Sequence, residues 1–535
     1  MFCSQPCFCL LGIVLLHWLP TQALFAQPEP EAFRFEASTV DGNLGGLTAV
    51  TIGPDGHLYV QEEDGDILRR QIDRSTGLPT GSTELLFNNT TEERFAIGLE
   101  FSPNATSGNL EAYVSYAEPN GTDQSNVARI TLPSVGDTAV LTVSDRTDVI
   151  TGLTVGLGNH TTNQFDFGPD GRLYFQLGST SGPGNDSETP LSAATLVADV
   201  LDPNFTPVDV GGNYDPNAPG APVQVYATGL RNAYDLVFHS NGNLYVPING
   251  NDSGGSTVDD PSTPLNESVA NNFNETLALV SEGSFHGHPN PDRDEFVLFG
   301  GNPTAGVDPF EVPALPVGVQ PNPNFDPNAN FDLIANQPTG QNFGSISPNG
   351  IDEFGGNTDL QGSLLIAFFR FGGPATIQTV QLDENGIPTS FNPILDEAGD
   401  LLILVGALDL TVDDTTGRIY VATRNGINSG NLIVLDPIAD ASPELAGDYN
   451  DDGFVNAADF TLFRDSFGAA HGTLANDGIG GAIGDLQFQQ FTGSFGATAP
   501  SSSAGQAIPE PMTMSVLLFG CGLASCGRYR CDSMV

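Results

Sequence analysis

The feature of this chain that most restricts its fold is a hairpin unit that recurs between residues 51 and 423. In the clearest copy, strand-forming residues from Phe165 to Phe175 flank a Gly-Pro-Asp-Gly turn at residues 168–171. Proline presets one turn dihedral and glycine accepts a positive one, so the pattern predicts two antiparallel strands joined by a tight turn. The six copies have their turn residues at Pro54, Pro103, Pro169, Ser240, Pro348 and Asp414.

Six copies at a spacing of roughly 50 to 110 residues match the blades of a propeller, in which each blade is a small antiparallel sheet and ring closure leaves few free edges. A β-sandwich, the alternative all-β architecture, would not require six copies of one signature. From about residue 33 to 436 the chain has almost no long helical period. We therefore predict an all-β fold with a six-bladed β-propeller over residues 27–438, interrupted by long loops at 251–272 and 302–342.

The charge balance restricts the partners of this fold. The sequence has 65 acidic residues against 16 basic ones, all of them Arg, and a net charge of −49. Such a field repels phosphate backbones, which argues against a nucleic-acid partner. It favours divalent cations and neutral substrates, and it equally fits acidity that keeps an exported protein soluble.

The first 26 residues resemble a secretory signal peptide, because a short apolar run at 8–19 is followed by small residues up to Ala26. The six cysteines are confined to residues 3–9 and 521–531. A body released from both ends would contain no disulfide, so its stability would depend on burial, sheet hydrogen bonds and bound metal.

Five segments in the body resemble the glucose/sorbosone dehydrogenase family and follow the family's order. They are residues 46–70, 95–103, 159–179, 225–246 and 347–423. The Asn-His pair before FGPDGRLYF and the GLRN stretch before the next turn are the most specific of these matches. The resemblance implies a six-bladed propeller that oxidises the C1 hydroxyl of a sugar with pyrroloquinoline quinone (PQQ), which calcium holds in place.

The same resemblance assigns roles to individual residues. His160 matches the family's catalytic base, and Arg231 and Asn232 match the catalytic and cofactor-binding pair that faces quinone and substrate. Since the chain has no lysine, Arg370 and Arg424 are the cations expected to meet the carboxylates of the quinone. The possible propeller calcium site corresponds to Gly250, Asn251 and Glu275.

Departures from the family pattern support a rival interpretation. Ser179 stands where an acid would orient the base, unless Asp166 or Asp186 approaches it, and Asn274 stands where another acid is expected. The rival is a non-catalytic cell-surface propeller that binds polysaccharide or protein. A third possibility, a metal-dependent lactonase of the propeller type, needs an acidic cluster in the central channel that the sequence alone does not assemble.

Two histidines in the segment SFHGHP have two interpretations. His286 and His288 could bind a metal, but we expect them to be solvent-facing loop residues.

Residues 445–497 carry a separate calcium signature. Oxygen-bearing side chains recur with the spacing that lets one loop wrap a calcium ion, with Gly453 at the sharp turn and Val455 as an apolar anchor. The predicted ligands are Asp448, Asn450, Asp452, the carbonyl of Phe454, Asn456 and Asp459. The loop and its helix recur at residues 476–495 with Asn476, Gly478, Gly480, Gly484 and Gln487 at the ligand positions, so we expect that copy to bind no metal.

This duplication resembles a type I dockerin, which implies a cohesin-bearing partner; a calcium-stiffened spacer is the alternative. After a linker at 498–508, residues 509–535 begin with Pro-Glu-Pro and continue as a short apolar run with two trailing arginines. They resemble a PEP-CTERM sorting tail, which implies envelope sorting machinery as a partner. We expect the protein in the periplasm, at the cell surface or in the extracellular matrix of a Gram-negative-type bacterium.

Overall fold

The computed structural model describes most of the body and part of the C-terminal region. The described residues are 33–89, 95–118, 124–156, 160–182, 188–250, 275–288, 290, 293, 295, 324, 326–333, 347–356, 360–438, 446–450, 452–469, 473–476 and 482–497. The predicted signal peptide and sorting tail, and most of the two predicted long loops, lie outside them. The chain divides into two compact units, residues 1–440 and 441–535.

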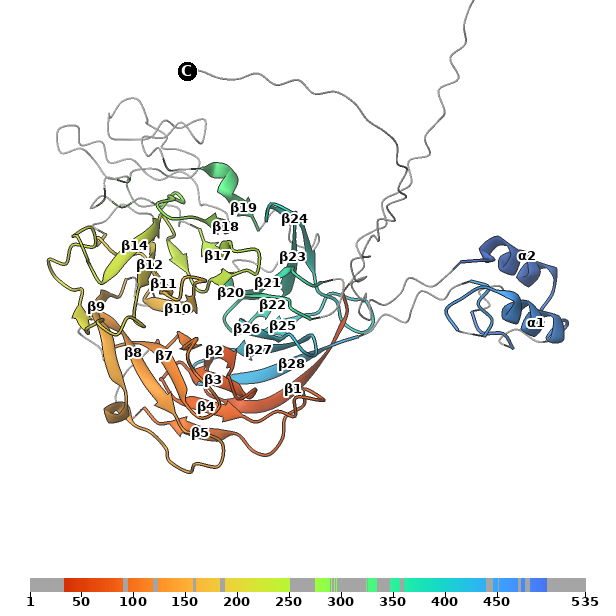
Figure 1. Cartoon of the computed structure of the whole chain (residues 1–535), viewed down its shortest axis with the longest axis horizontal. Helices are drawn as coiled ribbons and strands as arrows, with labels where there is room; N and C mark the ends of the chain where they lie inside the picture. The colour runs from red at the N-terminus through yellow and green to blue at the C-terminus, as the bar shows by residue number, and fades with distance from the viewer. Residues whose placement is uncertain are drawn as a thin grey trace, which may run out of the picture. The chain divides into compact units, whose positions relative to one another are not determined.

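The first unit is a six-bladed β-propeller, which confirms the predicted fold (Figure 1). The first blade contains β2 (Leu47–Ile52), β3 (Leu58–Glu62), β4 (Ile67–Arg70) and β5 (Glu84–Phe87). The second contains β6 (Leu99–Phe101), β7 (Leu110–Ala117), β8 (Gln124–Leu132) and β9 (Thr147–Thr154), to which β13 (Val208–Asp209) adds in parallel. The third contains β10 (Thr162–Phe167), β11 (Leu173–Leu177), β12 (Ala194–Ala198) and β14 (Val223–Thr228).

The last three blades follow in chain order. The fourth contains β15 (Asn232–Ala233), β16 (Val237–Phe238), β17 (Leu244–Asn249), β18 (Thr276–Val280) and β19 (Asn330–Asp332). The fifth contains β20 (Ser347–Glu353), β21 (Leu364–Phe369), β23 (Ile377–Leu382) and β24 (Pro388–Pro393). The sixth contains β26 (Ala407–Asp413), β27 (Arg418–Thr423), β28 (Gly430–Pro437) and β1 (Phe35–Leu44). A small sheet joins β22 (Pro374–Ala375) to β25 (Leu404–Val405), and short 3-10 helices lie at Val143–Asp145 and Pro327–Ala329.

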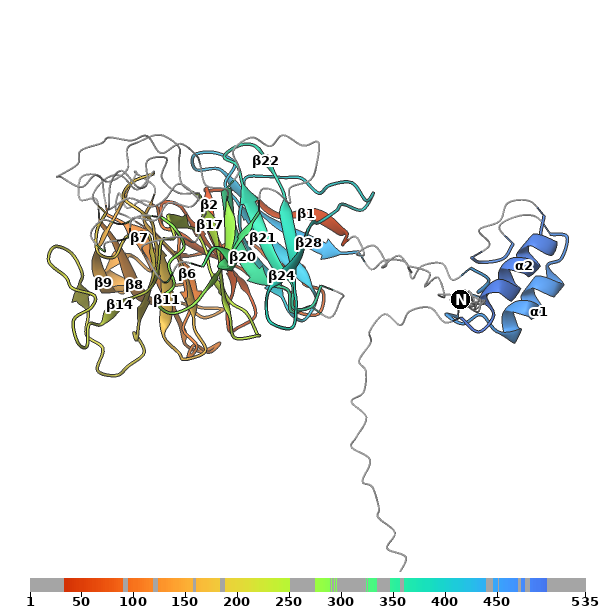
Figure 2. The same cartoon turned by 90° about the horizontal axis from the view of Figure 1, so that it is seen from above.

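The ring is closed by the first strand of the chain. β1 is the outer strand of the sixth blade and pairs along its length with β28, beside which it lies in Figure 2. Phe35 at its start is 1 % exposed and packs in the core shared by the fifth and sixth blades. The sixth sheet therefore joins both ends of the body and holds the circle shut.

Each predicted hairpin copy forms the inner strands of one blade. In four copies the second strand begins with a Leu-Tyr or Ile-Tyr pair, and these tyrosines, Tyr59, Tyr174, Tyr245 and Tyr420, are buried. The hydroxyl of Tyr174 donates to Asp170 in its own turn, where Gly171 has a φ of 80°. The turn chemistry read from the sequence thus fixes the hairpin register at Phe167 and Leu173.

The second unit contains two helices, α1 (Ala457–Asp465) and α2 (Asp485–Ser494). Aromatic rings from both helices stack on one another, with Phe463 and Phe488 at a centroid separation of 5.5 Å. Val455 and Ile483, one from each copy of the duplicated loop, are buried beside them. Within the described residues, neither helix of the protein is long and apolar enough to cross a membrane.

Candidate functional site

The predicted pocket residues lie on one rim of the propeller. All inner strands run in the same direction around the ring, so the start of an inner strand and the end of the strand paired to it share a rim. The registers that show this are Thr162 with Leu177, Asn232 with Asn249, Ser347 with Phe369 and Ala407 with Thr423. His160, Arg231, Asn232, Gly250, Arg370 and Arg424 each stand at or next to one of these ends.

Ser179 joins the predicted base to the predicted arginine. Its carbonyl oxygen and its hydroxyl oxygen lie 3.0 and 3.1 Å from Nδ1 of His160. Its backbone N–H donates to the carbonyl of Arg231 at 2.7 Å. Ser179 is therefore one of the contact points between the third and fourth blades.

These bonds assign the tautomer of His160. The hydroxyl of Ser179 donates its only proton to the carbonyl of Ser181 at 2.6 Å, and a carbonyl oxygen can only accept. Nδ1 of His160 must then carry the proton and donate to Ser179, which leaves Nε2 as the basic nitrogen.

The surroundings of His160 keep it neutral. Burial, followed by the positive charge of Arg231, lowers the pKa of His160 to about 3 despite the hydrogen bond to Ser179. The residue is only 4 % exposed. At physiological pH the imidazole is thus in the form that can accept a proton.

Gly178 lies between His160 and Asn232. A Cβ atom at Gly178 would lie 2.7 Å from Cβ of His160 and 2.8 Å from Oδ1 of Asn232, so only glycine fits between them. The Asn232 side chain accepts a hydrogen bond from Asn163 at 3.1 Å. The glycine that follows β11 therefore lets two blades approach closely.

The expectation for the two histidines of the SFHGHP segment was wrong. His286 and His288 are both buried, because residues 285–288 run alongside the end of β14 through hydrogen bonds to Thr228 and Gly229. His288 faces the carboxylate of Glu188, with Nε2 3.1 Å from Oε1. His286 is hydrogen-bonded to Asn330 and Ser284.

Glu188 is the acid near the base that the sequence did not identify. Of the two candidates considered, Asp186 lies outside the described residues and Asp166 accepts a hydrogen bond from Phe238 near the opposite rim. Glu188 is fully buried, and its negative charge acts on His160. No sequence motif marks this glutamate, because its partner His288 lies 100 positions further along the chain.

The candidate calcium residues are partly brought together. The backbone N–H of Gly250 donates to the carboxylate of Glu275. Next to them, Oδ1 of Asn249 is buried without a hydrogen-bond partner among the described residues, whereas its Nδ2 donates to Asn232 at 3.0 Å. Carboxylate and amide oxygens are calcium ligands, so this donor set fits the ion; Asn251 and Asn274 lie outside the described residues.

The two candidate cations for the quinone differ in their surroundings. Arg424 pairs with Glu63 of the first blade and lies over the ring of Phe371, with its guanidinium carbon 5.0 Å from the centroid. Arg370 follows β21 and packs on the turn at Gly373. Arg231 and Arg370 supply positive charge on the rim, which fits a cofactor bearing several carboxylates, whereas the charge of Arg424 is already paired with Glu63.

Buried side chains fill the channel behind this rim. The hydroxyl of Tyr234, from the fourth blade, donates to the carbonyl of Thr48 in the first blade at 2.6 Å. Gln164, from the third blade, bonds Leu99 in the second blade and Asp409 in the sixth. These two side chains cross the channel and separate its two ends.

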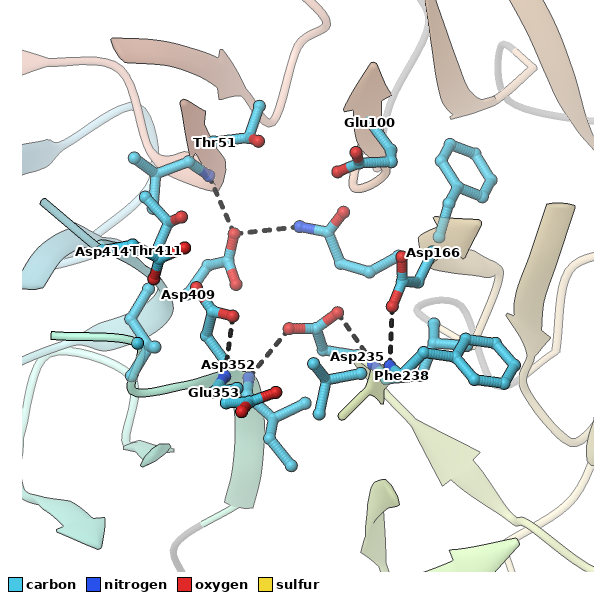
Figure 3. A pocket seen from close by; sticks show the side chains of 18 of the residues that line it. Thr51, Glu100, Asp166, Asp235, Phe238, Asp352, Glu353, Asp409, Thr411 and Asp414 are labelled. Carbon is cyan, nitrogen blue, oxygen red and sulfur yellow. Dashed lines mark hydrogen bonds between the residues drawn. The ribbon is translucent and has the colours of Figure 1, made fainter. Parts of the chain in front are cut away.

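A cavity of about 590 Å³ occupies the opposite end of the channel. Carboxyl groups from five blades converge on it (Figure 3); they belong to Glu100, Asp166, Asp235, Asp352 and Asp409. We call these five residues the channel acids. The structure thus assembles the acidic cluster that the lactonase alternative requires.

Four of the channel acids form hydrogen bonds between neighbouring blades. Each accepts a backbone N–H from the next blade: Asp166 from Phe238 at 2.7 Å, Asp235 from Ile351 at 2.8 Å, Asp352 from Val412 at 2.9 Å and Asp409 from Val50 at 2.8 Å. These bonds link the third blade to the fourth and continue around to the first. We assign the four carboxyl groups to holding neighbouring blades in register.

Burial raises the pKa of every channel acid. Asp166, Asp352 and Asp409 reach about 7, and Asp235, which also faces Asp409, is raised well above its ordinary value. Glu100 is raised in the same direction by burial and then by Asp166. Protons therefore neutralise much of this cluster near neutral pH.

In the second unit, the predicted calcium ligands lie within one loop, at residues 448–459, where hydrogen bonds hold its carboxylates in place. Asp448 accepts backbone N–H groups from Asp452 and Gly453, and Asp459 accepts from Asn450 and Asn456. Asp448 and Asp459 are buried at 1 % and 0 % exposure. Carboxylates held inward by backbone bonds fit a calcium ion.

The second copy of the loop is held by a different set of bonds. Gln487 accepts from the backbone of Gly484 at 2.9 Å, in the place of the Asp459 carboxylate, and Asn476 donates to the carbonyl of Asp448 at 2.9 Å. Gly478 and Gly480 lie outside the described residues.

No family model matches the sequence, and no curated protein matches it. Among solved structures, the chain is similar to an oxidoreductase described as a glucose dehydrogenase from Thermus thermophilus, at 19 % identity over 75 % of this chain and 99 % of the other, with a TM-score of 0.46. It is also similar to the PQQ-bound aldose sugar dehydrogenase from Streptomyces coelicolor, at 16 % identity over 75 % of this chain and 99 % of the other, with a TM-score of 0.45. A third similar structure is the calcium structure of a Trichoderma reesei carbohydrate-active enzyme of family AA12, at 17 % identity over 76 % of this chain and 97 % of the other, with a TM-score of 0.49.

Proposed function

We propose that the protein is an exported sugar dehydrogenase that oxidises the C1 hydroxyl of an aldose with PQQ and calcium. One observation carries the proposal. His160 and Arg231, which come from different blades, meet through Ser179 on one rim of the ring. His160 is held there in a neutral form with its basic nitrogen assigned to Nε2, as a proton acceptor requires.

The chain's own residues define the proton-transfer step. Nε2 of His160 accepts the proton of the sugar hydroxyl, while Nδ1 keeps its hydrogen bond to Ser179 and fixes the plane of the ring. When bound, PQQ would accept the hydride from the sugar carbon that bears this hydroxyl. Arg231 places positive charge beside the base, and an anionic cofactor that neutralises this charge would raise the pKa of His160 toward the range in which a base is effective.

The same rim offers residues to hold the cofactors. Asn249, Gly250 and Glu275 would supply oxygen ligands to calcium. The carbonyl of Asn232 accepts from Asn249, and the Asn232 side chain lies across Gly178 from His160. Arg231, Arg370 and Arg424 would face the carboxylates of the quinone.

We propose that the remaining parts of the chain direct this activity to the cell envelope. We propose that the loop at 448–459 binds calcium and stiffens a dockerin-like module, which either docks to a cohesin-bearing partner or spaces the propeller from its anchor. The N-terminal signal and the C-terminal sorting tail support export and retention at the bacterial surface.

The test uses the purified full-length protein with PQQ, calcium, an artificial electron acceptor and a panel of aldoses. We expect turnover that His160→Ala abolishes and that the matched variant His239→Ala retains. His239 is a suitable control because it lies at the other end of the channel, bonded to Gly362 and close to Glu353. Absence of both turnover and quinone binding would favour the rival function, a propeller that binds polysaccharide or protein without chemistry.

A further inference from the structure

A short strap of backbone contacts both members of the proposed pocket. In residues 179–182, Ser179 bonds the ring of His160, and the carbonyl of Gly182 accepts a hydrogen bond from Nε of Arg231 at 3.0 Å. The strap belongs to the third blade, whereas Arg231 belongs to the fourth. Its position therefore sets the relative placement of the base and the guanidinium.

One side chain anchors this strap. The Oε2 atom of Glu188 accepts from the backbone and hydroxyl of Thr180 at 2.7 and 2.8 Å, and from the hydroxyl of Ser192 at 2.6 Å. Its Oε1 accepts from the backbone and hydroxyl of Ser181, both at 3.1 Å. His288 completes the set through Nε2. A carboxylate has about four lone-pair positions, so these six donors fully occupy it.

The sixth contact ties the strap to the fourth blade. The backbone of His288 donates to the carbonyl of Gly229, two residues before Arg231, at 3.0 Å. His288 donates to Glu188 through Nε2, and burial lowers the pKa of His288 despite this pairing. Burial alone would raise the pKa of Glu188, but the hydrogen bond and the charge of His288, followed by the donors Ser192 and Thr180, bring it down to about 2.

We propose that Glu188 is the positioning residue of this pocket and takes over, through the strap 179–182, the orienting role that Ser179 cannot fill as an acid. The inference rests on the proposed function for its catalytic meaning, but its structural content concerns only the hydrogen bonds of His160. Glu188 does not touch the base. It holds the segment whose carbonyl fixes the Nδ1–H tautomer.

The charge of Glu188 adds a second effect. It acts against the positive charge of Arg231, which lowers the pKa of His160, and so keeps the base from becoming weaker still. Loss of the carboxylate would both loosen the strap and remove this compensation.

The experiment measures the His160 tautomer by NMR in the full-length protein labelled with ¹⁵N in its histidine rings, with the His160 signals assigned from His160→Gln. In the wild type we expect a single Nδ1–H form. In Glu188→Ala and Glu188→Gln we expect signals averaged between the two tautomers. In the milder variant Ser181→Ala, which removes one donor to Glu188, we expect a smaller change in the same direction.

The matched control is Glu295→Gln. Glu295 is also buried and bonds Thr228 and Arg293, but among the described residues it has no hydrogen bond to the strap. Its substitution should leave the His160 signals unchanged. Unchanged His160 signals in a folded Glu188→Ala protein, or in Ser181→Ala if the first variant fails to fold, would overturn the proposal.

Activity provides a separate readout. If the wild type turns over sugar, kcat should fall about 10- to 100-fold in Glu188→Ala, as for other residues that orient a functional histidine, and Glu188→Asp, which keeps the charge, should recover part of it. If the wild type shows no turnover but the tautomer change occurs, the positioning role stands and the proposed function fails.

Discussion

Replacing Asp409 with Asn should make the propeller relatively more stable as the pH rises. Asp409 is 3 % exposed and accepts hydrogen bonds from Val50 and Gln164 through one oxygen. Asn can keep that acceptor and turn its amide toward Asp235, the neighbouring channel acid. The substitution therefore removes the ionisation and keeps most of the contacts.

The magnitude follows from the pKa of this carboxyl group, which is about 7 in the folded protein against an ordinary value of 3.8. The stabilisation that the bound proton gives is fully present below pH 3.8 and is lost as the pH rises to about 7. The whole difference corresponds to about 4 kcal/mol, of which about 2 kcal/mol is lost between roughly pH 5.5 and 8. The Asp409→Asn variant has no such loss.

The assay is differential scanning calorimetry of the full-length chain in calcium at several pH values in this range. The midpoint of the variant relative to the wild type should rise by about 2 to 3 °C from roughly pH 5.5 to 8 for a body of this size. Asp383→Asn is the control, because this turn acid has a lowered pKa and stays ionised throughout the range. A midpoint difference for Asp409→Asn that does not change with pH would refute the reasoning.

Three further predictions concern the closure, the channel and the second unit. Phe35→Ala should lower the free energy of unfolding by about 3 to 5 kcal/mol, measured by urea denaturation, and a loss under 1 kcal/mol would show that β1 does not hold the ring. Tyr234→Phe removes the hydrogen bond across the channel and should lower the free energy of unfolding by about 1 kcal/mol in the same measurement. An unchanged free energy of unfolding would show that this bond does not stabilise the ring. Hydrogen exchange should show calcium-dependent protection of residues 448–467 but not of 476–495, and Asp459→Ala should abolish it; equal protection of both loops would contradict a single calcium site.

The repeated unit explains how much of the fold the sequence could predict. A hairpin depends on residues within about ten positions of one another, and both the Gly-Pro-Asp-Gly turn and the Tyr174 position lie inside that range. Six such local signals specified six blades. The use of β1 as the outer strand of the last blade was not predicted, because its pairing with β28 joins opposite ends of the body and has no local signature.

The site divides in the same way. His160, Arg231 and Asn232 could be proposed from the sequence because recognisable segments surround them. The channel acids were not recognised as a cluster, because their contacts join different blades and depend on the closed ring. Glu188 was missed because its partner His288 lies 100 positions further along the chain. The burial of His288 was mispredicted for the same reason, since only the neighbouring strand β14 turns that loop inward.

The pairing of β1 with β28 has a consequence for how the chain matures. The first strand to be made must wait for the last one, so every intermediate shorter than about 437 residues exposes an unpaired edge at the head of the body. Once the circle is complete, Arg34 and Ile438 are hydrogen-bonded neighbours, so the two ends could be fused and new termini opened in another blade.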